Sequence, residues 1–175
     1  MLTPGDVAPA FELPCALNDR LTRFSLAQAR TQLTVVFFYP RDFSFICPTE
    51  VVGFHKAARD FAAQETQLVG IGVDSAESHL QWARELGGIS YPLLSDEGGA
   101  VTRAFGVLDE QERAALRATF ILDQQRVVVY ALASRSNVGR SVGETLRVVC
   151  ALRTGRLCPA DWKPGQEFGP SDKNF

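Results

Sequence analysis

The chain has 175 residues, of which 46% are hydrophobic, with 18 Lys or Arg, 20 Asp or Glu and a formal net charge of −2. This length and apolar content suit one domain that buries a substantial core. The scattered basic residues exclude the positive surface that nucleic-acid binding requires, and we expect a small neutral substrate instead.

The N-terminal sequence and the cysteines narrow the class further. We find no basic segment followed by an apolar run, as in a signal peptide, and no stretch of about 18 apolar residues that could cross a membrane. We therefore expect a cytoplasmic protein with no membrane partner. The cysteines are too few for a disulfide scaffold and include no Cys-x-x-Cys pair, so we ask which of them is chemically reactive. They are Cys15, Cys47, Cys150 and Cys158.

The first elements are predicted from proline positions and apolar runs. Residues 1–14 contain three prolines and are expected to be extended, with one short edge strand around residues 11–13. Residues 33–39 and 67–73 are β-branched and aromatic runs without alternation, as in a parallel sheet covered on both faces. Between them, residues 48–64 carry an apolar stripe spaced by three or four, which predicts a helix.

The second half of the chain continues the alternation. A helix at 74–86 is indicated by an acidic capping box from Asp74 to Glu77 and by the glycine pair that follows it. The pattern then predicts a strand at 91–94, a short helix at 98–105, an antiparallel hairpin of 118–122 with 127–132, and a helix from Ser141 to Leu152. We expect an α/β fold with a central mixed β-sheet and helices on both faces. The domain would span residues 1–175, with an aperiodic C-terminal arm at about 154–175.

Cys47 is the candidate reactive residue because of its place in the chain. Pro48 is favoured at the first helical position, so we expect Cys47 at the N-cap. There the sulfur would face unpaired backbone N–H groups and the positive end of the helix dipole, which stabilise the nucleophilic thiolate. The position alone leaves open that Cys47 is a structural cysteine filling an apolar pocket.

Three other chemistries for this cysteine fit poorly. The base of a cysteine protease cannot be His55, which lies eight residues further along the same helix, about 12 Å away. We expect a surface or capping role for His79. Glu50 stands where a dithiol oxidoreductase has its second cysteine, and Cys150 and Cys158 lack the spacing and the additional ligands of a zinc site.

The segment from Phe37 to Glu50, FFYPRDFSFICPTE, closely resembles the active-site segment of the typical 2-Cys peroxiredoxins, the alkyl hydroperoxide reductase C and thioredoxin peroxidase family. Further resemblances follow in the family's order at Ile71–Ser75 with His79 and Trp82, Tyr91–Asp96, Ala115–Asp123, Gly139–Leu146 and Cys158–Gly165. The resemblance implies a thioredoxin-like fold. It also implies a thiol peroxidase that reduces hydrogen peroxide and organic hydroperoxides without a metal, haem or flavin cofactor.

By the same resemblance, Cys47 is the peroxidatic residue, whose thiolate attacks one peroxide oxygen and becomes a sulfenic acid. Attack on an O–O bond builds charge on both oxygens. The Ser44 hydroxyl, the Cys47 backbone N–H and the Arg117 guanidinium can donate hydrogen bonds to them. Pro40 would shield the sulfur from water.

Two supporting residues, and one position that differs from the usual residue of the family, complete the predicted site. Glu50 alone would oppose a thiolate, so we assign it to holding Arg117 and Arg140. Ser44 stands where the family more often has threonine, so the hydroxyl is retained and the methyl that restricts its rotamer is lost. We expect activity to be preserved, at a reduced level.

Cys158 falls where the family keeps its resolving cysteine, which condenses with the sulfenic acid into a disulfide between two subunits. This implies a homodimer, and the family often builds decamers of five dimers, to whose interface Phe43 and Phe45 would contribute. A thioredoxin-like protein or a dedicated disulfide reductase would reopen the disulfide. Residues 85–90 are shorter than the glycine-rich insertion of peroxide-sensitive members, so we expect resistance to overoxidation.

Two alternatives belong to other classes. Ring-forming relatives expose hydrophobic surface and pass oxidation to partners, so a holdase chaperone or a peroxide sensor and relay is an alternative function. A binding module with a dead site is disfavoured, because the chain retains Pro40, Ser44, Cys47 and Arg117.

Overall fold

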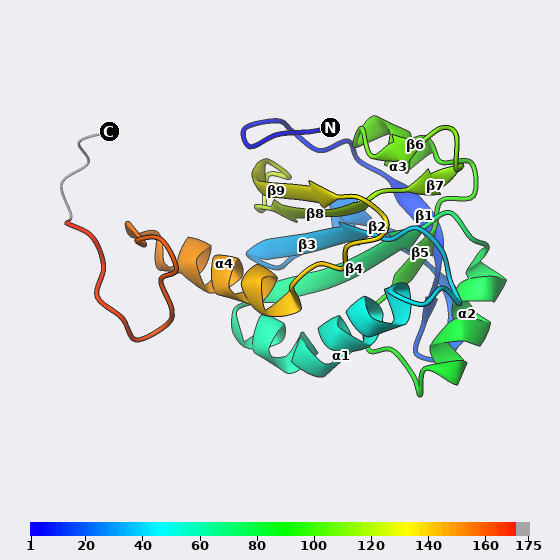
Figure 1. Ribbon diagram of the computed structural model, residues 1–175, viewed down its shortest axis with the longest axis horizontal. Helices are drawn as coiled ribbons and strands as arrows, with labels where there is room; N and C mark the ends of the chain where they lie inside the picture. The colour runs from blue at the N-terminus through cyan, green and yellow to red at the C-terminus, as the bar shows by residue number, and fades with distance from the viewer. Residues whose placement is uncertain (171–175) are drawn as a thin grey trace.

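A mixed β-sheet runs through the centre of the molecule (Figure 1). The computed structural model describes residues 1–170. The strands are β1 (Glu12–Leu17), β2 (Arg20–Ser25), β3 (Leu33–Phe38), β4 (Thr66–Gly72), β5 (Leu93–Ser95), β6 (Leu108–Asp109), β7 (Ala114–Ala115), β8 (Arg117–Leu122) and β9 (Val128–Ser134). The helices are α1 (Cys47–Ala63), α2 (Ala76–Glu85), α3 (Ala100–Ala104) and α4 (Val142–Thr154), and a 3-10 turn, η1, spans Leu26–Gln28.

Seven strands form the central sheet in the order β2-β1-β5-β4-β3-β8-β9. The predicted strand-helix-strand unit is confirmed, since β3 and β4 are parallel and α1 connects them. The predicted hairpin is confirmed as well, with β8 antiparallel to β9. Every residue of β3 is buried, because this strand lies inside the sheet with packed layers on both faces.

The two faces of the sheet carry separate cores: the three longer helices lie on one face, and on the other the short helix α3 contributes Val101. On one face α1, α2 and α4 pack around Phe37 and Phe54, whose rings stack with centroids 4.3 Å apart. On the other face the N-terminal segment and the residues after α3 enclose Phe38, Phe105 and Phe120. Neighbouring residues of β3 thus serve opposite cores, as the pleat of a strand requires.

The N-terminal prediction was incomplete. Instead of one short edge strand, residues 12–25 form a hairpin in which β1 pairs antiparallel with β2. Its turn uses Asn18 and Asp19 at φ 51° and 60°, the positive values of a two-residue hairpin turn. Strand β2 lies at the edge of the sheet and is mostly exposed, so it has no apolar run to predict it. The small β6–β7 ladder was also not predicted.

The helix starts show one correct and one wrong capping prediction. Helix α4 begins as expected, with the Ser141 hydroxyl accepting from the Glu144 backbone N–H at 3.1 Å. Helix α2 does not begin at Asp74, because the Ser75 hydroxyl caps it by accepting from the Ser78 N–H at 3.1 Å. The Asp74 carboxylate accepts instead from a loop residue described below.

The C-terminal arm follows Gly155, whose φ of 62° ends α4 in a left-handed cap. Residues 155–170 contain no helix or strand, as the lack of periodicity predicted, and residues 171–175 of the predicted arm lie outside the described residues. None of the helices in the described part of the chain combines the length and the apolar character needed to span a membrane.

Candidate active site

Cys47 lies at the start of α1, directly after the loop that leaves β3. The N-cap is Ile46, with φ −90° and ψ −40°, and Cys47 is already the first helical residue, so its predicted place at the N-cap was wrong by one position. Pro48 follows within the first turn, where its missing N–H costs nothing. The Cys47 side chain is 0% exposed.

Arg117 reaches the sulfur from the neighbouring strand. It is the first residue of β8, which pairs antiparallel with β3, so its side chain emerges beside the loop that follows β3. Its Nη1 lies 3.3 Å from the Cys47 sulfur and donates to Glu50 Oε2 at 2.7 Å, while its Nε donates to the Ser136 carbonyl at 2.8 Å. These contacts fix the guanidinium against the sulfur.

Glu50 lies one turn after Cys47 on the same face of α1 and binds a second arginine. Its Oε1 accepts from the Arg140 backbone N–H at 2.8 Å and from Nε at 3.1 Å. The Arg140 guanidinium also donates to the Ala118 carbonyl at 2.8 Å. Burial lowers the pKa of Arg140, and the neighbouring Glu50 carboxylate opposes this shift.

The charges of this cluster do not balance without the sulfur. Both arginine side chains and Glu50 are at most 3% exposed, so two buried cations face one buried carboxylate. Buried charge is costly unless it is balanced. A thiol at Cys47 leaves one positive charge unbalanced, whereas a thiolate makes the cluster neutral.

Ser44 and Pro40 complete the surroundings of the sulfur. The Ser44 oxygen accepts from the Cys47 backbone N–H at 3.3 Å, which leaves its own O–H available to donate. The Cys47 N–H that we expected to face a peroxide is therefore paired with Ser44. Pro40 is buried and offers no backbone donor that could hold water.

A second buried polar group lies behind the loop and was not predicted. His79 is 0% exposed, so the expected surface or capping role was wrong. Its Nδ1 lies 2.7 Å from the Asp42 carboxylate, and its Nε2 lies 3.0 Å from the Leu94 carbonyl. The nearest signal in the sequence was the presence of both Asp42 and His79 in segments that resemble the family.

The remaining cysteines lie away from this cluster. Cys15 is fully buried in β1, and burial raises the pKa of its thiol to about 11. Burial also raises the pKa of Cys150 in α4. The Cys158 sulfur lies near the end of α4, 3.5 Å from the Thr154 hydroxyl, and the structure does not bring it to Cys47. Within residues 1–170, no three His, Cys, Asp or Glu side chains gather as a metal site.

Comparisons with known proteins identify the family. The sequence profile described as the AhpC/TSA family matches residues 4–131. The chain belongs to the AhpC/TSA family of peroxiredoxins. It is 40% identical over 172 residues to the "Putative peroxiredoxin YkuU" of Bacillus subtilis, an alignment that covers 93% of this chain and 96% of that protein.

Solved structures agree with the fold. The reduced 2-Cys peroxiredoxin of Plasmodium vivax superimposes with a TM-score of 0.89 at 31% identity, over 96% of this chain and 93% of that chain. AhpC of Mycobacterium tuberculosis superimposes with a TM-score of 0.85 at 34% identity, over 93% of this chain and 99% of that one. The thioredoxin-like fold that we expected is confirmed, and this peroxiredoxin is a thiol peroxidase.

Proposed function

We propose that this peroxiredoxin reduces hydrogen peroxide and organic hydroperoxides at Cys47. The observation that carries the proposal is the buried cluster in which Arg117 contacts the sulfur at 3.3 Å and which is neutral only with a thiolate. In the reaction the thiolate attacks one peroxide oxygen, the O–O bond breaks and an S–O bond forms. Cys47 becomes a sulfenic acid, and the departing oxygen takes a proton and leaves as water or alcohol.

The neighbouring groups would act by hydrogen bonding. Negative charge develops on both oxygens as the O–O bond breaks, and donors aimed at that charge lower the barrier. We assign Arg117 and the Ser44 hydroxyl as these donors, and the Cys47 N–H as a third when a peroxide replaces Ser44 as its acceptor. Glu50 and Arg140 position Arg117, and Pro40 excludes water. Each of these residues thereby has a proposed role in the peroxidase activity of the family.

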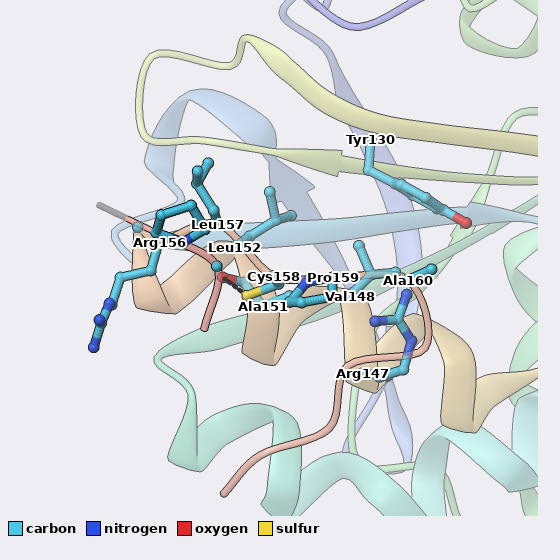
Figure 2. Close-up of a pocket in the computed structure, with 13 residues that line it drawn as sticks. Tyr130, Arg147, Val148, Ala151, Leu152, Arg156, Leu157, Cys158, Pro159 and Ala160 are labelled. Atoms are coloured by element: carbon cyan, nitrogen blue, oxygen red, sulfur yellow. Dashed lines mark hydrogen bonds between the residues drawn. The ribbon is translucent and has the colours of Figure 1, made fainter. Parts of the chain in front are cut away.

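We propose Cys158 as the resolving residue of an intersubunit disulfide. Its sulfur faces α4 in a groove of about 1030 Å³ that also borders Tyr130 and Arg147 (Figure 2). Strand β9 ends the sheet, and its first residue, Val128, exchanges backbone hydrogen bonds with Gly5 and Asp6. Beyond Val128 the described chain pairs β9 with β8 alone, so the rest of its outer edge can pair with a second copy. Condensation of the Cys47 sulfenic acid with a partner's thiol forms the S–S bond and releases water.

The assembly and the electron donor belong to the same proposal. Phe43 and Phe45 project from the active-site loop and are 51% and 94% exposed, which suits a contact between dimers and so a decamer of five dimers. A thioredoxin-like protein or a dedicated reductase reopens the disulfide by thiol exchange. Residues 1–175 would form one domain with the arm at 154–175. The cytoplasmic location stays a prediction from the sequence.

Peroxide turnover coupled to a thioredoxin system tests the proposal. Wild type should consume many equivalents of peroxide, Cys47→Ser none, and Cys158→Ser only about one per subunit. Nonreducing gels should show a covalent dimer that Cys158→Ser removes. Substoichiometric consumption by wild type would favour the sensor or chaperone alternative, and a covalent dimer that survives Cys158→Ser would exclude this resolving residue.

A further inference from the structure

The loop between β3 and α1 is tied to the rest of the fold at Asp42. This residue lies two positions after Pro40 and two before Ser44, and it is 8% exposed. Its carboxylate meets one side chain at the start of the loop, Tyr39 Oη at 3.2 Å, and two side chains of α2, Ser78 Oγ at 2.7 Å and His79 Nδ1 at 2.7 Å. We call Asp42 and these three residues the Asp42 latch.

The two ring nitrogens of His79 connect the latch to the rest of the fold. Its Nε2 faces the Leu94 carbonyl at 3.0 Å, and a carbonyl only accepts, so Nε2 carries a proton. Its Nδ1 faces the Asp42 carboxylate, so a second proton lies between them. The imidazole therefore joins the loop to β5 through two buried hydrogen bonds, one at each ring nitrogen. Burial raises the pKa of Tyr39, so its hydroxyl stays protonated and donates to Asp42.

The loop backbone is held as well, in a conformation that it would not adopt freely. The Asp42 N–H donates to the Asp74 carboxylate at 2.8 Å, which fixes the main chain at the same point. The next residue, Phe43, has φ 53°, a left-handed value that is unfavourable for a bulky side chain. Such a conformation persists only where its surroundings impose it. Here Asp42 holds one side, and the Ser44 contact with Cys47 holds the other.

Resolution by the partner's Cys158 requires this loop to move, since Cys47 is fully buried. We propose that the Asp42 latch holds the loop in its peroxide-binding form, and that release of the latch frees the oxidised Cys47 for disulfide formation. The inference rests on the proposed function and adds positioning residues that do not touch the sulfur.

The latch would divide the fate of the sulfenic acid between two reactions. With the loop closed, a second peroxide can react, so that another O–O bond breaks, a second S–O bond forms, and a sulfinic acid plus water or alcohol results. With the loop open, the Cys158 thiol attacks, forms the disulfide and releases water. A weaker latch should therefore speed disulfide formation and slow both peroxide reactions.

Two serines on α2 provide a matched pair of variants. Ser78→Ala removes one donor to the Asp42 carboxylate and changes the volume little. Ser75→Ala removes the cap of the same helix, which lowers stability by about 1 kcal/mol, and does not touch Asp42. If the effect arose from a weakened helix, the two variants would behave alike.

His79 provides a second pair. The amide of His79→Asn keeps a donor at the position of Nδ1, which faces Asp42. The longer amide of His79→Gln keeps a donor at the position of Nε2, which faces the Leu94 carbonyl, and loses the hydrogen bond to Asp42 in the loop. A role that is only structural depends on both bonds, so only the latch predicts that Asn preserves more function than Gln. Should His79→Gln fail to fold, the comparison of Ser78→Ala with Ser75→Ala decides alone.

The measurement can use the protein's own fluorescence. The Trp82 ring lies 5.6 Å from Tyr39 and 6.2 Å from Phe43, so it reports the loop. The chain has two tryptophans, and Trp162→Phe isolates this one. Stopped-flow traces then separate the peroxide step from disulfide formation. In a Cys158→Ser background, mass spectrometry follows the sulfinic acid at Cys47 without competition from resolution.

We expect Ser78→Ala and His79→Gln to form the disulfide about tenfold faster and the sulfinic acid about tenfold more slowly, the change that loss of one hydrogen bond to a charged group produces. Ser75→Ala should match wild type in both rates. Equal rates in Ser75→Ala and Ser78→Ala, or faster sulfinic acid formation in Ser78→Ala, would overturn the latch. Absence of turnover and of a disulfide in wild type would instead refute the proposed function.

Discussion

Glu50→Gln removes the only carboxylate that we find between the two arginines of the active site. In the described residues Glu50 accepts from Arg117 at 2.7 Å and from Arg140 at 2.8 and 3.1 Å, and its side chain is 2% exposed. Glutamine has the same shape, but one of its two terminal atoms is an NH₂ group, which meets guanidinium donors instead of accepting from them. The variant therefore leaves two buried cations with no carboxylate and with the Cys47 sulfur as the one remaining group in the cluster that can carry negative charge.

The expected cost follows from this geometry. Removing one partner of a buried ion pair costs about 3–5 kcal/mol, a large part of the roughly 5–15 kcal/mol that stabilises a native protein. For a chain of this size each kcal/mol lowers the melting temperature by about 2–4 °C, so we expect a fall of about 10 °C. Arg117 would keep its bond to Ser136 and its contact with the sulfur but lose the carboxylate that holds Nη1, and the looser guanidinium should slow the peroxide step about 10–100-fold.

Thermal unfolding of the reduced protein measures the first effect, at one fixed subunit concentration because association shifts the midpoint. The matched control is Glu144→Gln, which removes a carboxylate from Arg147, bound at 2.7 and 2.8 Å but with the Glu144 side chain 44% exposed. Exposed pairs contribute less than about 1 kcal/mol, so the control should melt within about 4 °C of wild type. Equal melting temperatures for Glu50→Gln and Glu144→Gln would refute the reasoning.

Three further predictions concern single side chains. Arg117→Lys keeps the charge but cannot contact the sulfur, Glu50 and Ser136 together, so the second-order rate with hydrogen peroxide, measured by stopped flow, should fall about 100-fold. Ser44→Ala should slow the same step at least about tenfold, whereas Ser44→Thr, which keeps the hydroxyl, should match or exceed wild type; equal rates for both variants would contradict a donor role. Burial raises the pKa of the Cys15 thiol from 9.0 to about 11, so the neutral thiol stabilises the fold fully below pH 9, and about 2–3 kcal/mol is lost as the pH rises to 11. Thermal unfolding of the reduced protein across this range should show a steeper loss for wild type than for Cys15→Ala.

The buried centre of the fold was predictable because its signal is local. Strands β3 and β4 are apolar throughout, since both faces of the sheet are covered, and α1 shows its stripe because one side faces the core. Strand β2 gave no such signal because its side chains face water at the edge of the sheet. Its turn could have been predicted from Asn18 and Asp19, which tolerate the positive φ that a two-residue hairpin requires.

In the candidate site, too, the features with a local signal were predictable and those that depend on the fold were not. Pro48 placed the start of α1 to within one residue, and the error arose because Ile46 has near-helical backbone angles instead of the extended ones usual at an N-cap. The pairing of Asp42 with His79 was not predictable from spacing, since the two residues lie 37 positions apart and meet only when the loop folds onto α2. The sequence pattern also assigned Asp74 to the cap of α2. Its carboxylate accepts instead from the Asp42 N–H, a contact that likewise forms only when the loop folds onto α2.

The active-site loop is thus restrained at two points that respond differently to oxidation. The contact of Arg117 with the sulfur belongs to a buried cluster that is balanced while Cys47 carries a negative charge. Once the sulfur becomes a neutral sulfenic acid, the two arginines face Glu50 alone, and the closed pocket loses electrostatic support. The hydrogen bond between Asp42 and His79 does not involve the sulfur. Oxidation therefore weakens only the restraint next to Cys47, and the strength of the Asp42 latch determines how soon the loop opens.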